Sequence, residues 1–160
     1  MNTANNDTAS QIEPLSWNEY SEAVNELSTQ IKDSNFEPDI ILAIARGGLF
    51  LAGSIGYAIK VKNISVINVE LYTGINEKLE VPMMLPPLLN KLELKNMKVL
   101  VCDDLTDSGQ TMATVNEYLK DVVAVSQSAV LYEKSKSITK CDFVWRRTDK
   151  WVDFPWSSLE

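Results

Sequence analysis

The stretch Val99-Leu100-Val101-Cys102-Asp103-Asp104-Leu105-Thr106-Asp107-Ser108-Gly109-Gln110-Thr111 decides both the fold and the place of the site. Its apolar first part, 99–102, predicts a strand buried on both faces of a parallel sheet. Carboxylates follow at the carboxyl end of this strand, which in open α/β sheets is the edge where ligands bind. The small residues after them predict a turn into a helix whose free N–H groups face an anion. We therefore expect a sugar-phosphate site here.

An ordinary strand-turn-helix junction with an aspartate N-cap is the alternative interpretation of this stretch. Asp103 and Asp104 are adjacent, and Asp107 follows within a few residues. Like charges placed so close repel each other unless a cation or a polyhydroxyl ligand offsets them. The pattern therefore favours a binding site over a simple helix cap.

Hydrophobic periodicity along the chain predicts an α/β domain with a mostly parallel, twisted sheet and helices on both faces. A capping-box pattern, Ser16 with Glu19, predicts a first amphipathic helix. The expected strands cover 39–45, 64–71, 99–103, 122–132 and 141–146, and further helices cover 48–60 and 111–120. We expect a disordered tail over 1–10 and a single domain over 11–160. Within it, 72–96 shows little periodicity and is expected to be an irregular, mobile loop.

Composition narrows the classes of partner and compartment. The chain has 160 residues, 45% of them hydrophobic, and a net charge of -7. No basic patch is concentrated anywhere, which argues against a nucleic-acid partner, and no apolar stretch is long enough for membrane insertion. Cys102 and Cys141 fall in apolar strands and are expected to be free core thiols. A reducing, cytoplasmic location is the expectation.

The acidic stretch resembles the phosphoribosyl-pyrophosphate (PRPP) binding motif of type I phosphoribosyltransferases. Residues 39–49 resemble the first strand and pyrophosphate loop of that family. Lys134, together with 151–156, resembles the base-binding end of its 6-oxopurine members. The resemblance implies the type I phosphoribosyltransferase fold, with a small hood formed by terminal segments and 148–160 as its base-binding part.

The resemblance also implies a role for each motif around the donor. Asp103 and Asp104 would bind the ribose hydroxyls, directly or through Mg²⁺, with Asp104 on the metal side. Asp107 would be the general base that takes the N7 proton of a purine. Arg46 and Gly47 would bind pyrophosphate, and a cis peptide is expected between Ala45 and Arg46 or nearby. The 5′-phosphate-binding set comprises Asp107, Ser108, Gly109, Gln110 and Thr111.

At the base end, the resemblance assigns Lys134 as the donor to the exocyclic O6 of a purine. Trp151 would stack on the purine ring, Val152 would offer backbone hydrogen bonds, and Asp153 would lie near a 2-substituent. Tyr72, in the flexible loop, would cover the site. Taken singly, a lysine at a strand end is more often a solvated charge, and a tryptophan such as Trp151 or Trp156 more often packs in a core. Their order after the PRPP motif favours the base-binding interpretation.

The function implied by the resemblance is purine salvage. A 6-oxopurine (guanine, xanthine or hypoxanthine) and PRPP would be converted to the nucleoside 5′-monophosphate and pyrophosphate, with Mg²⁺ as cofactor, by a homodimer or homotetramer. Two alternatives stay open. One is a PRPP-sensing regulator with the same fold, and the other is a phosphoribosyltransferase for a pyrimidine base.

Overall fold

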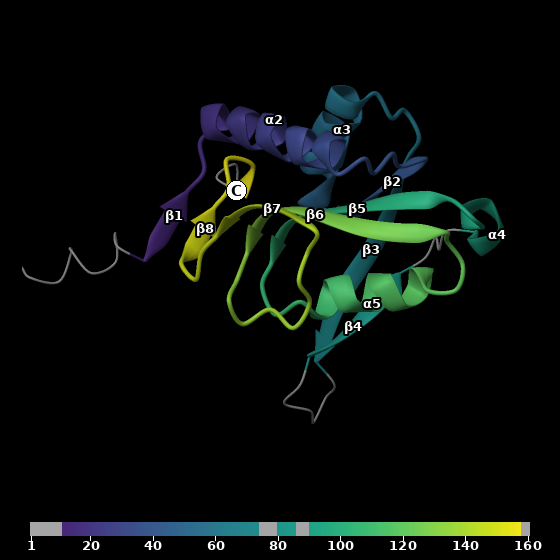
Figure 1. Cartoon of the computed structure of the whole chain (residues 1–160). Coiled ribbons are helices and arrows are strands. Elements are labelled where there is room, and N and C mark those ends of the chain that lie inside the picture. The colour runs from purple at the N-terminus through teal and green to yellow at the C-terminus, as the bar shows by residue number, and fades with distance from the viewer. Residues whose placement is uncertain (1–10, 74–79, 86–89, 158–160) are drawn as a thin grey trace, which may run out of the picture.

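A six-stranded sheet forms the centre of the molecule, in the order β4-β3-β2-β5-β6-β7 (Figure 1). The computed structural model describes residues 11–73, 80–85 and 90–157. All neighbouring strands of this sheet run parallel except β3 and β4, which are antiparallel. The strands are β2 (Ile40–Ala45), β3 (Ile64–Thr73), β4 (Glu80–Leu85), β5 (Lys98–Thr106), β6 (Val125–Glu133) and β7 (Phe143–Arg147). The expected mostly parallel α/β sheet is thus confirmed.

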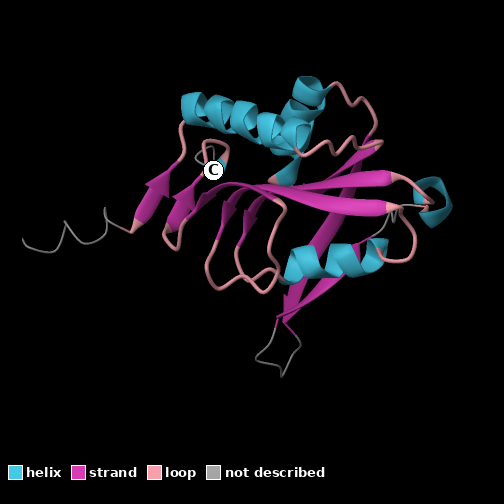
Figure 2. Cartoon of the chain, in the orientation of Figure 1, coloured by secondary structure: helices cyan, strands magenta, loops and turns pink. Residues whose placement is uncertain are grey.

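Two helices cover one face of the sheet and a third covers the other (Figure 2). On one side lie α2 (Trp17–Asp33) and α3 (Gly48–Ile59). On the opposite side lies α5 (Gln110–Leu119). The predicted capping box at Ser16 is present, because the Ser16 hydroxyl accepts from the Glu19 N–H while the Glu19 carboxylate accepts from the Ser16 N–H.

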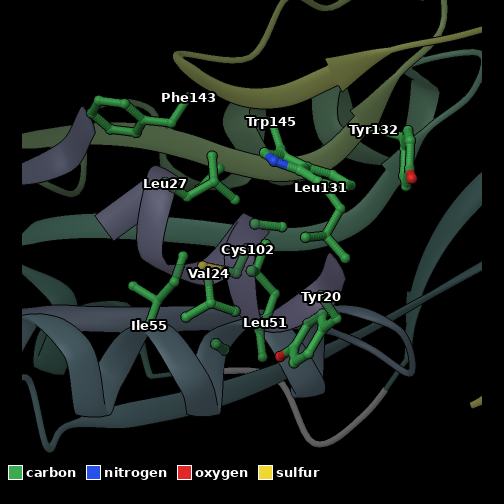
Figure 3. Packing of buried hydrophobic residues seen from close by; sticks show 14 of the residues in the cluster. Tyr20, Val24, Leu27, Leu51, Ile55, Cys102, Leu131, Tyr132, Phe143 and Trp145 are labelled. Carbon is green, nitrogen blue, oxygen red and sulfur yellow. The ribbon is translucent and has the colours of Figure 1, made fainter. Parts of the chain in front are cut away.

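Successive side chains of the central strands point to opposite faces of the sheet, so a hydrophobic core forms on each face. Ile41 and Cys102 pack with Leu27 of α2 and Leu51 of α3, and Figure 3 shows part of this cluster. Their neighbours in sequence belong to the other cluster, against Met112, Val115 and Leu119 of α5. Because both faces of β2 and β5 are covered, the near-continuous apolar runs of these strands are explained.

The two ends of the described chain meet in a small second sheet. β1 (Ile12–Pro14) pairs in parallel with β8 (Trp151–Asp153). Leu15 continues the pairing, since its N–H donates to the Asp153 carbonyl at 2.9 Å. This sheet is the hood of terminal segments that the sequence predicted, although residues 158–160 lie outside the described chain.

The prediction of one irregular loop over 72–96 is wrong in its structural content. β3 runs on to Thr73, β4 pairs with it, and a short helix α4 (Lys91–Leu94) follows. Pro82 obscured β4 in the sequence, but β4 is an edge strand, where a missing N–H can face away from the ladder. Residues 74–79 and 86–89, and the expected tail over 1–10, lie outside the described residues.

Two smaller expectations can be compared directly with the structure. Cys102 and Cys141 are both buried and free, as expected, but Cys141 precedes β7 rather than opening it. In the part of the chain that the structure describes, no helix has the length and apolar character needed to cross a membrane.

Candidate functional site

Two adjacent carboxylates lie in the last residues of β5. The strand runs to Thr106, further than the expected end at residue 103, so Asp103 and Asp104 point to opposite sides of its carboxyl end. The Asp103 carboxylate accepts a hydrogen bond of 2.9 Å from the Asp104 N–H. Both side chains are partly enclosed, which places two negative charges at the edge of the sheet without exposing them fully.

This placement makes the charged forms of both carboxyl groups unfavourable. Burial raises the pKa of Asp103 well above its ordinary value, and the neighbouring Asp104 charge adds to the increase. Burial also raises the pKa of Asp104, although hydrogen bonds from Asp103 and Trp156 oppose the change. A cation or a set of sugar hydroxyls would stabilise the ionised pair, so these side chains suit a polyhydroxyl or metal-bound ligand.

The turn after β5 presents the amino end of α5 to a pocket of about 320 Å³. Gly109 is the N-cap of α5, with a φ of 84° and no side-chain cap, so the aspartate N-cap alternative does not hold. The pocket is lined by Asp103, Asp107, Ser108 and Thr111, among others. Free N–H groups at a helix amino end together with hydroxyl groups are well suited to an anion such as phosphate.

The loop after β2 lies against this acidic pair. Strands β2 and β5 are neighbours, with Ala43 opposite Cys102, so their carboxyl ends meet at one edge. A Cβ at Gly47 would overlap the Asp104 carboxylate, so only glycine allows this approach. The peptide between Ala45 and Arg46 is cis, as predicted, and the Arg46 side chain is exposed. Arg46 and the amino end of α3 therefore face the same edge as Asp104.

The loop from 134 to 141, after β6, lies against the turn at 107–109. The Ser108 carbonyl accepts from the Ile138 N–H at 2.9 Å, and the Gly109 carbonyl accepts from the Thr139 hydroxyl at 3.0 Å. Buried Glu133 closes the base of this loop by accepting from the Cys141 N–H at 2.8 Å. These contacts hold the loop's lysines beside the acidic turn.

Two lysines of this loop approach Asp107. Lys134 Nζ lies 3.9 Å from Asp107 Oδ1, and its side chain is only 12% exposed. Lys136 Nζ lies closer, at 2.9 Å from the same oxygen. The predicted purine-binding lysine and the predicted general base are thus brought together, with a second ammonium group beside them.

The hood is attached next to Lys134. The Thr148 N–H donates to the Glu133 carbonyl, and the Asp149 carboxylate accepts from the Ser135 N–H at 2.9 Å. Trp151 follows with a side chain that is 72% exposed, while Val152 is buried and Asp153 is exposed. Because Trp151 and Asp153 turn their backbone groups towards β1, the backbone groups of Val152 face the other edge. An aromatic face and a strand edge thus remain available in the hood.

Sequence reasoning missed two contacts of this site. Trp156 belongs to the segment 151–156 that resembles the base-binding end, but the hydrogen bond from its side chain to Asp104 was not predicted. Lys136 was not considered, although it lines the pocket and contacts Asp107. The sequence signal that could have identified Lys136 as a site residue is its position just after strand β6. Tyr72 belongs to β3, but its side chain falls outside what the structure describes.

The two carboxylates at the end of β5 are also candidate metal ligands. Within 11–73, 80–85 and 90–157, no three His, Cys, Asp or Glu side chains are grouped to hold a metal ion. Mg²⁺, however, commonly binds through one or two carboxylates and completes its shell with water and substrate phosphate oxygens. The adjacent, partly enclosed carboxylates of Asp103 and Asp104, with raised pKa values, fit this kind of site.

Comparisons with known proteins agree with this geometry. The family model of the phosphoribosyl transferase domain matches residues 16–158. The chain belongs to this family. A purine phosphoribosyltransferase from Pyrococcus horikoshii OT3 superposes with a TM-score of 0.79 at 29% identity, over 91% of this chain and 94% of that one.

Two further phosphoribosyltransferases share the fold at lower identity. The xanthine-guanine-hypoxanthine phosphoribosyltransferase of Helicobacter pylori has a TM-score of 0.76 at 22% identity, over 91% of this chain and 93% of that one. A hypoxanthine phosphoribosyltransferase of Staphylococcus aureus has a TM-score of 0.71 at 18% identity, over 91% of this chain and 82% of that one. The architecture is therefore that of the purine phosphoribosyltransferases, and family membership supports a transferase activity.

Proposed function

We propose that this phosphoribosyltransferase transfers the phosphoribosyl group of PRPP to a 6-oxopurine, which yields a nucleoside 5′-monophosphate and pyrophosphate. The observation that carries the proposal is the meeting of Lys134 and Asp107 beside the phosphate pocket. An acidic group that can take a proton and a cation that can donate to a carbonyl oxygen would then lie on the same purine edge. Family membership supports the donor, and this pair supports the base.

In this proposal the donor is held at both of its charged ends. The turn from Asp107 to Thr111, at the amino end of α5, binds the 5′-phosphate through its backbone N–H groups and the Ser108 and Thr111 hydroxyls. Asp103 and Asp104 accept hydrogen bonds from the ribose hydroxyls. Arg46 and the Gly47 backbone bind the pyrophosphate. Mg²⁺, held by Asp104 and donor oxygens, would offset the charge of the departing pyrophosphate. Holding both ends aligns the anomeric carbon with the incoming base.

The base is held by the hood and Lys134. Trp151 stacks on its face, the Val152 backbone bonds its ring edge, and Asp153 lies near its 2-substituent. N9 of the purine forms a bond to C1′ while the bond from C1′ to the pyrophosphate oxygen breaks. The Asp107 carboxylate takes the proton from N7, a step that contributes about 10²- to 10⁴-fold in rate.

Lys134 gives this site its preference for an oxygen at position 6. Its ammonium group can donate to a carbonyl but cannot accept from an amino group, so adenine would leave a poorly exposed cation without an acceptor at position 6 of the purine. The pyrimidine alternative is tested separately with uracil, because the carbonyl oxygens of uracil can also accept from Lys134. A cytoplasmic, oligomeric protein completes the proposal.

The experiment is a panel of bases incubated with Mg²⁺ and PRPP, with nucleotide and pyrophosphate measured together. We expect turnover with at least one of guanine, xanthine and hypoxanthine and none with adenine or uracil. Lys134→Met should lower kcat/KM for the 6-oxopurine by about 100-fold and leave PRPP binding intact. Lys120→Met, in an exposed ion pair with Glu117, is the control and should behave as the wild type.

Other outcomes would count against specific parts of the proposal. Turnover only with adenine or uracil would contradict the base assignment. Binding of PRPP without turnover of any base would favour the sensor alternative. Equal loss in the Lys134→Met and Lys120→Met variants would show that Lys134 has no particular role.

A further inference from the structure

Lys136 contacts the carboxylate that the proposed chemistry needs. Its Nζ lies 2.9 Å from Asp107 Oδ1, closer than the 3.9 Å that separates the Lys134 Nζ from the same oxygen. In this arrangement Asp107 already has a cationic partner before any purine arrives. The free carboxylate that would take a proton from N7 is therefore partly neutralised.

The backbone near Lys136 is held against the same turn. The Ser137 N–H donates to the Lys134 carbonyl at 3.1 Å, and Ile138 and Thr139 bond Ser108 and Gly109 as described above. A Cβ at Gly109 would come within 2.5 Å of the Ser137 hydroxyl, so the two segments are in close contact. The backbone near Lys136 is thus held against the turn, while the Lys136 side chain, which lines the pocket, is largely exposed.

The negative charge of the pocket must be offset by a cation if a phosphate is to bind there. Asp103 and Asp107 line it, and Lys136 is the one positively charged side chain among the described lining residues. A phosphate monoester brings close to two further negative charges at neutral pH. The amino end of α5 supplies only about half a positive charge. A phosphate in this pocket therefore needs the Lys136 ammonium group to offset the carboxylates.

The contact between Lys136 and Asp107 is weak enough to exchange. Their side chains are 62% and 52% exposed, and ion pairs between exposed groups contribute little to stability. A phosphate offers more charge and three acceptor oxygens, so it competes well for the ammonium group. Lys134 is farther from Asp107, at 3.9 Å, and less exposed, so it can stay in place for the base.

We propose that Lys136 is the cationic ligand of the 5′-phosphate, and that its move from Asp107 to the phosphate frees the Asp107 carboxylate for the base. This inference rests on the proposed function. It makes Lys136 a specificity residue for the 5′-phosphate and gives the site an order of events. The donor binds first and, by drawing Lys136 away, prepares Asp107 to take the N7 proton.

Calorimetric titration of ribose 5-phosphate and of pyrophosphate tests this inference by binding alone. Lys136→Met should weaken ribose 5-phosphate binding about tenfold or more and change pyrophosphate binding less than about twofold. Lys136→Arg should restore binding because it keeps the charge. The matched control is Lys120→Met, whose side chain is 61% exposed and also pairs with a nearby carboxylate, and it should change neither ligand.

A double-mutant cycle tests the exchange itself. Asp107→Asn removes the competitor for Lys136, so it should tighten ribose 5-phosphate binding in the wild-type background. In the Lys136→Met background, the gain in ribose 5-phosphate affinity from the same change should be at least threefold smaller. Weaker binding in Asp107→Asn, or an equal effect in both backgrounds, would overturn the exchange.

The outcomes separate this inference from the proposed function. If the wild type binds ribose 5-phosphate and pyrophosphate and Lys136→Met binds both equally well, the inference is wrong and the proposed function stands. If the wild type binds neither compound, the proposed function fails and the inference fails with it.

Discussion

The side chain of Trp156 hydrogen-bonds the carboxylate of Asp104, which joins the C-terminal segment to the end of β5. The Trp156 ring stacks on Phe50 at 4.4 Å and on Phe154 at 4.9 Å between ring centroids. Phe50 lies on α3 just after the Arg46-Gly47 loop, so the same aromatic group contacts both sides of the proposed donor site. Trp156 is therefore a positioning residue for Asp104.

Replacement of Trp156 by phenylalanine keeps an aromatic ring and removes the hydrogen bond. Since that bond lowers the pKa of Asp104, its loss should raise this pKa and move the acidic limb of Mg²⁺-PRPP binding to higher pH. We also expect KM for PRPP to rise about 10-fold to 100-fold, because a hydrogen bond to a charged group contributes about 1.5–3 kcal/mol. Trp17→Phe, which changes a ring that packs on Trp156, is the control. An unshifted pH profile in Trp156→Phe would contradict the positioning role.

Asp104→Asn should stabilise the protein while it removes activity. Burial and mutual repulsion disfavour the charged carboxyl groups in the fold, so this cost is present above their raised pKa values and disappears below about 3.8, their ordinary value. The variant should therefore have a higher Tm than the wild type at pH 7, by about 2–4 °C for each kcal/mol gained, and a smaller advantage at pH 4. Thermal scans with and without Mg²⁺-PRPP provide the measurement. A lower Tm for the variant at pH 7 would refute the electrostatic account.

Much of the fold was predictable because its evidence is local. The apolar runs at 40–44 and 99–102 are buried on both faces, and such near-continuous apolar runs indicated strands of a parallel sheet. Pro82 hid the edge strand β4, since proline is unfavourable in strands unless an edge accommodates it.

The candidate site was predictable only in part, for a physical reason. Asp103, Asp104 and Asp107 are neighbours in sequence, so their charge pattern could be recognised without a structure. The contacts of Lys136 and Trp156 depend on how segments distant in sequence pack against the end of β5. The amino-acid types at these two positions do not reveal that packing. Their docking is fixed by backbone hydrogen bonds such as the one from Ile138 to Ser108.

Gly109→Ala should destabilise the turn at 107–109. Gly109 has a φ of 84°, and a Cβ there would approach the Thr139 nitrogen at 2.7 Å. We expect a loss of about 1–3 kcal/mol in the free energy of unfolding, with weaker ribose 5-phosphate binding. Gly53→Ala is the matched control, because a Cβ at Gly53 meets nothing within 4 Å in helix α3. In urea titrations it should stabilise the protein by about 0.5–1 kcal/mol. Equal stability of the two variants would contradict the role given to Gly109.

Glu133→Gln should destabilise the protein at neutral pH. Burial alone would raise the pKa of Glu133, but hydrogen bonds from Cys141 and Arg147 outweigh it, and the pKa is lowered in the fold. The stability that this carboxylate contributes is therefore present above its ordinary pKa of 4.5 and is lost as the pH falls through the lower folded value. The variant should lose about 2 kcal/mol at pH 7, and its difference from the wild type should shrink below pH 4.5. A stability difference between the variant and the wild type that grows on acidification would contradict the lowered pKa of Glu133 in the fold.

The most direct test of the account is a calorimetric titration of the folded protein with PRPP in the presence of Mg²⁺. The account predicts saturable binding by the wild type, strongly weakened in Asp103→Asn and Asp104→Asn and retained in the Gly53→Ala control. An absence of binding heat up to millimolar PRPP, in protein shown to be folded by circular dichroism, would contradict the claim that the acidic end of β5 holds the activated ribose.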